Sequence, residues 1–113
     1  MAFTDLELVS LQEKINSFID RIRPPKALRS KLDYGYKITN QSIEIFEIRS
    51  DMRNRIMNNS FIKTTYNRAK NIWKIYWMRA DLKWHSYEPD PEAASIDNVL
   101  RIVEEDEYCC FFG

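Results

Sequence analysis

The chain has 113 residues, of which 44% are hydrophobic, 13% aromatic and 30% charged. This length predicts one domain, residues 1–113, whose modest core needs neither disulfide bonds nor a metal ion. The composition excludes a disordered polymer, and no run approaches the ~18 apolar residues that span a bilayer. Residues 1–5 lack the basic and apolar regions of a signal peptide, and the adjacent Cys109 and Cys110 provide no disulfide framework. We therefore expect a cytoplasmic protein without a membrane partner.

The net charge is zero, but the charge is unevenly distributed along the chain. Residues 49–87 contain nine basic and two acidic residues, a net +7, whereas residues 88–113 contain one basic and eight acidic residues, a net −7. Two interpretations follow. The basic segment binds an anionic partner, or the two segments neutralise one another within the fold.

The N-terminal part of the chain has the pattern of an amphipathic helix. Apolar residues recur every three or four positions between Leu8 and Ile22. Thr4 and Glu7 form a T-x-x-E capping box before it, and Pro24-Pro25 ends it. Residues 26–32 indicate a short further helical turn.

Strands are expected in the middle of the chain. Residues 34–39 and 42–49 are predicted to form a hairpin around Asn40-Gln41. Phe46 interrupts the alternation of the second strand, which indicates a bulge or burial on both faces.

Residues 50–60 are polar and are predicted to be a loop. Residues 61–68 and 72–79 are predicted to form a second hairpin around Ala69-Lys70, followed by a short strand over 82–87. Residues 72–79 are apolar on both faces, so we expect a strand covered on both sides, with Trp73 and Trp77 largely buried.

The last part of the chain returns to a helical pattern. Asp90-Pro91 is predicted to cap a helix whose apolar residues run from Ile96 to Val103. The acidic residues 104–107 oppose the helix dipole, so either a basic group lies near them or the helix ends before them. Residues 108–113 are expected to pack against the body. The expected fold is α+β: an N-terminal helix, an antiparallel β-sheet of about four to five strands, and a C-terminal helix packed on the sheet.

A resemblance rests on the stretch W-K-I-Y-W-M-R-A-D-L-K-W-H-S-Y-E-P at residues 73–89 and on the terminus E-D-E-Y-C-C-F-F-G at 105–113. The chain resembles a family of small bacterial proteins that is classed only as a domain of unknown function. It departs from that family at Ser50, where relatives tend to have proline, and at Cys109, where they tend to have glycine. The resemblance implies a bacterial, cytosolic, single-domain protein and no particular reaction.

The main candidate for chemistry is the predicted strand over 82–87. On an extended strand Asp81, Lys83, His85 and Tyr87 would point the same way, with Leu82 and Trp84 inward. Such a row could transfer protons or bind an anion. The alternative is a solvent-facing edge strand whose polar side chains pair with each other.

An enzyme would draw its catalytic residues from Asp81, His85 and Glu47. A magnesium ion held by Glu47, Asp81 and the acidic run would resemble a metal-dependent nuclease, and Glu47-Ile48-Arg49 resembles an E-x-K strand with arginine in place of lysine. A Cys110–His85 thiol dyad would require the terminus to cross the strand. The histidine and cysteine spacing does not match a zinc site, and with two glycines no phosphate loop is possible. We expect no metal and no cofactor.

The basic segment is also rich in aromatic residues, a combination used by nucleic-acid-binding sheets. The leading hypothesis is a non-enzymatic binding or regulatory module for nucleic acid or an acidic protein. A small metal-dependent or acid–base enzyme and a protein-interaction module that uses an edge strand remain as alternatives. The predicted anion-binding residues are Arg49, Arg53, Arg55, Arg79, Lys83, His85 and Tyr87.

Overall fold

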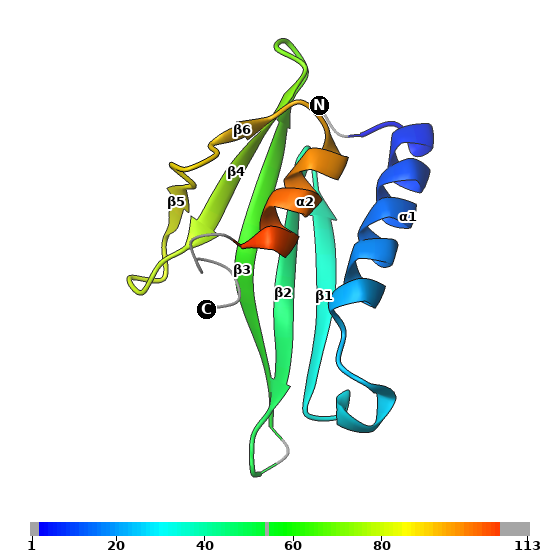
Figure 1. Ribbon diagram of the computed structural model, residues 1–113, viewed down its shortest axis with the longest axis vertical. Helices are drawn as coiled ribbons and strands as arrows, with labels where there is room; N and C mark the ends of the chain where they lie inside the picture. Colours follow the sequence, from blue (N-terminus) through cyan, green and yellow to red (C-terminus); the bar gives the residue numbers. More distant parts are fainter. Residues whose placement is uncertain (1–2, 54, 107–113) are drawn as a thin grey trace.

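The computed structural model describes residues 3–53 and 55–106. The fold is an antiparallel sheet whose core-forming face is packed by two helices (Figure 1). The elements are α1 (Asp5–Ile22), the 3-10 turn η1 (Lys26–Leu28), β1 (Leu32–Thr39), β2 (Ser42–Ser50), β3 (Ile56–Asn67), β4 (Ile72–Met78), β5 (Trp84–Ser86), β6 (Glu92–Ala93) and α2 (Ile96–Glu105). The strand order is β1-β2-β3-β4-β5, and β6 also pairs with β4. The expected α+β class is confirmed. The predictions for residues 107–113, including the packed terminus and the Cys110–His85 dyad, lie outside the described residues.

Helix α1 begins and ends as its sequence predicts. The Thr4 hydroxyl accepts a hydrogen bond from the Glu7 amide at 3.2 Å, and the Glu7 carboxylate accepts one from the Thr4 amide at 2.8 Å. The helix stops at Ile22, before the two prolines, and only Lys26–Leu28 form a further turn. Its buried stripe consists of Leu11, Ile15, Phe18 and Ile19.

The first hairpin is confirmed, and an irregularity does fall at Phe46, but the extra residue of the bulge belongs to the partner strand β3. Asn40, at the turn, has a φ of 53°, a left-handed conformation that asparagine tolerates. Ile45 lies opposite Ile62 whereas Phe46 lies opposite Ser60, so Phe61 is the extra residue of a bulge. The Phe46 ring also explains Gly35, because a Cβ atom there would lie 2.8 Å from it.

The prediction of a polar loop over residues 50–60 is wrong. Strand β2 continues to Ser50, and β3 already begins at Ile56, directly opposite Ser50. Residues 56–59 are exposed although they are in a strand. The polar residues around them concealed the strand, and the hairpin is extended here by backbone pairing of β2 with β3.

The predicted double coverage of β4 is also wrong. The strand is interior, pairing with β3 on one edge and with β5 and β6 on the other. Trp73 and Ile75 are buried on the face that forms the core. Trp77, on the same face, is only half-buried. On the opposite face Lys74 is exposed and Ile72, Tyr76 and Met78 are half-buried, because both helices pack on the other side of the sheet.

Helix α2 is capped by Ser95 rather than by Asp90. The Ser95 hydroxyl accepts a hydrogen bond from the Asn98 amide at 3.2 Å. Residues around Pro91 stay extended because the Pro91 carbonyl accepts a hydrogen bond from the Ile75 amide at 2.9 Å and Glu92–Ala93 pair with β4. Pairing with β4 thus keeps this segment extended although Asp90-Pro91 is typical of a helix start. No described helix is long and apolar enough to cross a membrane.

The core lies between the helices and one face of the sheet. Its side chains with the least exposure come from both helices, from β2, β3 and β4, and from the segment after β5: Ile15, Phe18, Ile43, Ile62, Ile75, Tyr87, Val99 and Val103. The buried hydroxyl of Thr64 donates to the Lys74 carbonyl at 2.8 Å, so this polar group is satisfied.

Replacement of Ile75 tests the position of the core. Ile75 is completely buried, so Ile75→Ala is expected to lower the free energy of unfolding by about 2–5 kcal/mol, and Ile75→Val by about 0.5–1.5 kcal/mol. The control Ile56→Ala, at a residue 74% exposed, should change it by less than about 0.5 kcal/mol. Urea denaturation of the variants measures these differences. Equal losses at the two positions would contradict the described core.

The acidic C-terminal segment pairs with α1. The Asp97 carboxylate lies 3.1 Å from the Lys14 ammonium, and the Glu104 carboxylate lies 3.1 Å from the Arg21 guanidinium. Arg21 is therefore the expected basic group near the end of α2. Glu105 pairs with Arg101 of α2 itself, at 3.4 Å. The interpretation that the acidic segment 88–113 neutralises the basic segment 49–87 stays a prediction.

Two further ion pairs connect the ends of α1 to the sheet. Arg23 donates two hydrogen bonds to Asp33 of β1, at 2.8 and 2.7 Å, and lowers the pKa of that carboxyl group. At the other end Arg68 donates to Glu7 at 2.6 and 3.1 Å. The guanidinium of Arg68, with the Thr4 amide second, lowers the pKa of Glu7 from 4.5 to about 2.

The Glu7–Arg68 pair predicts a pH-dependent stability. Because the folded pKa of Glu7 is lowered, its contribution is complete above pH 4.5 and is lost as the pH falls toward about 2. Glu7→Gln should therefore lower the melting temperature at neutral pH, and the difference from the native chain should vanish over that interval. Glu13→Gln, on the exposed side of the same helix, is the control and should show no such dependence. A pH-independent difference at Glu7 would contradict the assignment.

Candidate functional site

The predicted row of polar side chains before and along β5 does not form. Residues 79–83 make a tight turn in which the Lys83 carbonyl accepts from the Arg79 amide at 3.2 Å. Leu82 has a φ of 61° and is 81% exposed, so it does not point inward. Tyr87 is 1% exposed and belongs to the core. The prediction that Tyr87 binds an anion at the surface is therefore wrong.

Asp81 and His85 are brought together at this turn. The Asp81 carboxylate lies 2.9 Å from Nε2 of His85, and its other oxygen accepts from the Lys83 amide at 3.0 Å. The pKa of Asp81 is lowered, mainly by the hydrogen bond from His85 and next by the hydrogen bond from the Lys83 amide. Arg79 lies over the Trp77 ring, 5.5 Å from its centroid. The arrangement is a histidine–carboxylate hydrogen bond at a turn, beside a cation–π contact.

Removal of the imidazole should raise the pKa of Asp81. In His85→Leu the hydrogen bond that is the largest cause of the lowering is lost, so the Asp81 carboxyl group should titrate at higher pH than in the native chain. Carbon-detected NMR of the aspartate carboxyl groups measures the change. Asp51, whose carboxylate is held by other partners, is the internal control and should keep its pKa. An unchanged Asp81 titration would show that the pair does not persist in solution.

Glu47 lies apart from the Asp81–His85 pair. It is on β2 and is paired with Arg49 of the same strand, with a second contact of 3.2 Å. Strands β3 and β4 separate it from the turn that carries Asp81. Among residues 3–53 and 55–106, no three histidine, cysteine or acidic side chains are placed to hold a metal ion.

A basic end of the molecule does form, from two segments that are distant in sequence. We define the basic end as residues 26–31, 49–53 and 55–57. The Lys31 carbonyl accepts from the Ser50 amide at 3.1 Å, and Leu32 lies opposite Arg49. The turn at 26–31 and the β2–β3 loop accordingly lie at the same end of the molecule, at the bottom of Figure 1. The basic side chains there are Lys26, Arg29, Lys31, Arg49, Arg53 and Arg55.

Most of this positive charge is not neutralised. Arg49 pairs with Glu47, and Arg55 pairs with Asp51 at 2.7 Å. The other four basic residues form no ion pair within the described part of the chain: Lys26, Arg29, Lys31 and Arg53. Sequence analysis identified Arg49, Arg53 and Arg55 but missed the other three, because only the strand pairing brings residues 26–31 beside residue 50.

Asp51 organises the β2–β3 loop. One carboxylate oxygen accepts from the amides of Arg53 and Arg55, at 2.8 and 2.9 Å, and the other accepts from the Arg55 guanidinium. The Asp51 amide donates to the Arg55 carbonyl at 3.0 Å. These hydrogen bonds to the carboxylate lower the pKa of Asp51, and the bond from the Arg55 amide has the largest effect. The only acidic residue of the loop is thus occupied in holding its backbone.

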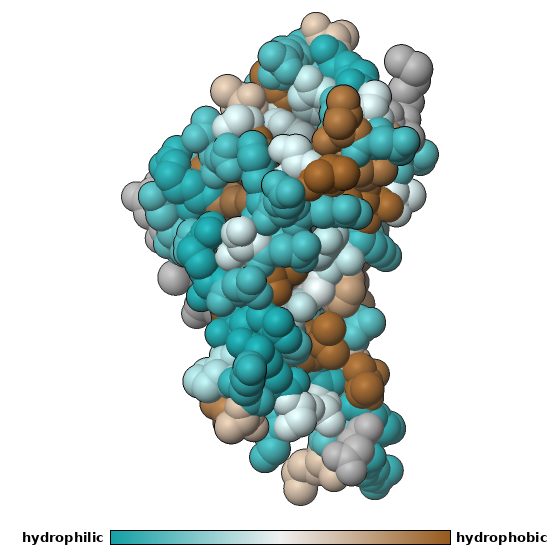
Figure 2. Space-filling view, turned by 90° about the vertical axis from the view of Figure 1, so that its right-hand side faces the viewer, coloured by the Kyte–Doolittle hydropathy of each residue, from teal (hydrophilic) through white to brown (hydrophobic). Residues whose placement is uncertain are grey.

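The basic end also exposes large apolar side chains. Leu28 is 53% exposed. Three apolar residues of the β2–β3 hairpin tip are exposed as well: Met52 at 102%, Ile56 at 74% and Met57 at 51%. Figure 2 shows the α1 side of the molecule, where hydrophilic side chains predominate and hydrophobic ones gather in smaller groups. Cationic and apolar groups therefore occur together at one protruding end.

The fold and the basic end define a small α+β protein with a cationic hairpin tip. The chain belongs to the family described as Domain of unknown function (DUF3024), whose model matches residues 3–113. No curated protein and no solved structure matches the chain. The prediction that the chain belongs to a family of unknown function is confirmed. That residues 73–85 are a motif characteristic of this family stays a prediction.

Proposed function

We propose that this protein is a cytoplasmic bacterial binding module that attaches to single-stranded nucleic acid through its basic end, without catalysing a reaction. The observation that carries the proposal is the gathering, at one end of the molecule and beside exposed apolar side chains, of four cations that form no ion pair with another described residue. Arg79 and Lys83, at the β4–β5 turn, and His85 of β5 are not part of the basic end and are not needed for this contact.

The chemistry of the basic end suits a phosphate polymer. Each lysine or arginine that meets a phosphate releases a condensed counterion, which favours binding at low salt. Arginine guanidinium planes stack on unpaired bases, and apolar side chains can pack against base faces. The exposed side chains of Asn58 and Asn59 add amide groups that can hydrogen-bond to base edges.

A protruding tip favours a polymer over a small anion. The cations are contributed by a hairpin loop and an adjacent turn, and they are mostly exposed rather than gathered in a cleft. The enzyme hypothesis has less support, because Glu47 is separated from Asp81 and His85 and is itself paired with Arg49.

The test measures binding of a fluorescein-labelled single-stranded DNA of about 15 nucleotides at several salt concentrations. The native chain should bind at ~50 mM salt, with an affinity that falls linearly in log salt. In Lys31→Gln/Arg53→Gln two cations are lost, so the slope should become shallower by about 1.4, or about 0.7 for each contact. Fluorescence anisotropy measures both quantities.

The matched control is Lys70→Gln/Lys74→Gln, which removes the same charge at the opposite end of the sheet, near the β3–β4 turn (Figure 1). This variant should retain the native slope. Equal weakening by the two double variants would show that binding is non-specific with respect to the surface. Absence of binding at ~50 mM salt would contradict the proposal and favour an acidic protein as the partner.

A further inference from the structure

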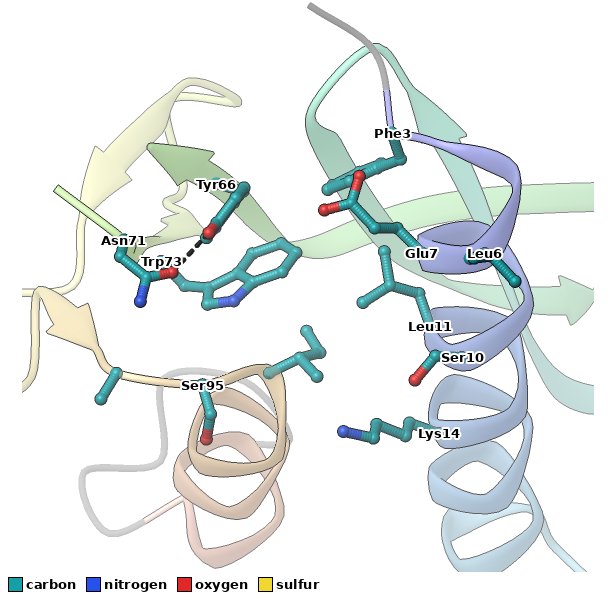
Figure 3. Close-up of a pocket in the computed structure, with 12 residues that line it drawn as sticks. Phe3, Leu6, Glu7, Ser10, Leu11, Lys14, Tyr66, Asn71, Trp73 and Ser95 are labelled. Carbon is teal, nitrogen blue, oxygen red and sulfur yellow. Dashed lines mark hydrogen bonds between the residues drawn. The ribbon is translucent and has the colours of Figure 1, made fainter. Parts of the chain in front are cut away.

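A cleft of about 450 Å³ lies between the N-terminal halves of α1 and α2, at the end of the molecule opposite the hairpin tip. Its lining is mainly apolar: Leu6 and Leu11 come from α1, Ile96 from α2, and Phe3, Tyr66 and Trp73 form an aromatic cluster (Figure 3). This volume is in the range of sites for small molecules, roughly 300–1,000 Å³.

An aromatic cluster gives one wall of the cleft a fixed shape. The rings of Phe3 and Trp73 are stacked with centroids 5.7 Å apart, and those of Tyr66 and Trp73 are 4.9 Å apart. Tyr66 is further held by a hydrogen bond to Asn71, drawn in Figure 3. Such a wall offers a flat apolar surface that needs little reordering when a ligand binds.

The indole N–H of Trp73 donates no hydrogen bond to another described residue and faces the cleft (Figure 3). Trp73 is only 6% exposed, yet its N–H makes no hydrogen bond to any described residue. In Figure 3 the indole nitrogen faces the space between the sheet and the start of α2. This N–H is not among the buried polar atoms that lack a partner, so solvent reaches it from the cleft, and an acceptor group of a ligand can take the place of that water.

The polar groups around the cleft are mainly donors. Lys14 extends from α1 toward α2, and its ammonium lies 3.1 Å from Asp97, which is 66% exposed at the outer edge. The hydroxyl groups of Ser10 and Ser95 also line the cleft. Glu7, the acidic residue among the lining side chains, is already paired with Arg68.

We propose that this cleft binds a small molecule that has a flat apolar body and a single carboxylate. The apolar body lies against Trp73 and Leu11. The carboxylate accepts a hydrogen bond from the indole N–H and lies near the Lys14 ammonium. This site is separate from the basic end and does not depend on the proposed nucleic-acid binding.

The test titrates the ¹⁵N-labelled full chain with indole-3-acetate and, in parallel, with the neutral indole-3-acetamide. The chain has three tryptophans, so Trp77→Phe and Trp84→Phe assign the Trp73 indole resonance by elimination, without altering the cleft. Indole-3-acetate should shift the Trp73 resonance saturably, and indole-3-acetamide should bind about tenfold more weakly.

Two lysine variants separate the charge contribution. Lys14→Met should weaken indole-3-acetate about tenfold and leave indole-3-acetamide unchanged, whereas Lys26→Met, at the basic end, should affect neither. The proposal is overturned if the Trp73 resonance does not shift up to the solubility limit of the probe. It is also overturned if the shift occurs at Trp77 or Trp84 instead, or if Lys14→Met leaves the affinity for indole-3-acetate unchanged.

Discussion

The structure depends on the burial of two apolar helix stripes against one face of a single antiparallel sheet. Ile15 and Phe18 from α1 and Val99 and Val103 from α2 meet isoleucines of β2, β3 and β4, and all of these side chains are almost completely buried. A chain of this size has little other apolar area to bury, so this layer supplies most of its stability. Parts of the chain that do not reach the layer keep exposed side chains, and these include the hairpin tip with its arginines.

Much of the fold was predictable because the signals were local. The capping box at Thr4, the helix stop at Pro24 and the turn at Asn40 act within a few residues, and each appears in the structure as the sequence indicates. The interrupted alternation at Phe46 marked the position of the bulge, although its extra residue, Phe61, lies in the partner strand. In such places the chemistry of neighbouring residues decides the backbone conformation.

The errors arose where a distant part of the chain decides. Asp90-Pro91 has the chemistry of a helix start, but pairing with β4 keeps the following residues extended and leaves the cap to Ser95. Tyr87 reads as the end of an alternating polar strand, but its amide bonds to Ile75 and its ring enters the core. Only half of the basic residues at the basic end were predicted. Arg49, Arg53 and Arg55 are close in sequence and were identified. Lys26, Arg29 and Lys31 come close to them only because β1 pairs with β2 in this register.

The two halves of the β2–β3 hairpin differ in how they are held, and this has a consequence for motion. Near the core, Ile43, Ile45 and Ile62 tie the strands to the helices, whereas residues 56–59 are exposed and depend on backbone pairing and on the Asp51 loop. Local opening of a hydrogen-bonded segment costs less where few apolar contacts must separate. Residues 56–59 can therefore separate from β2 while the helices stay packed on the sheet. Their amide protons exchange with solvent long before those of Ile62 and Thr64.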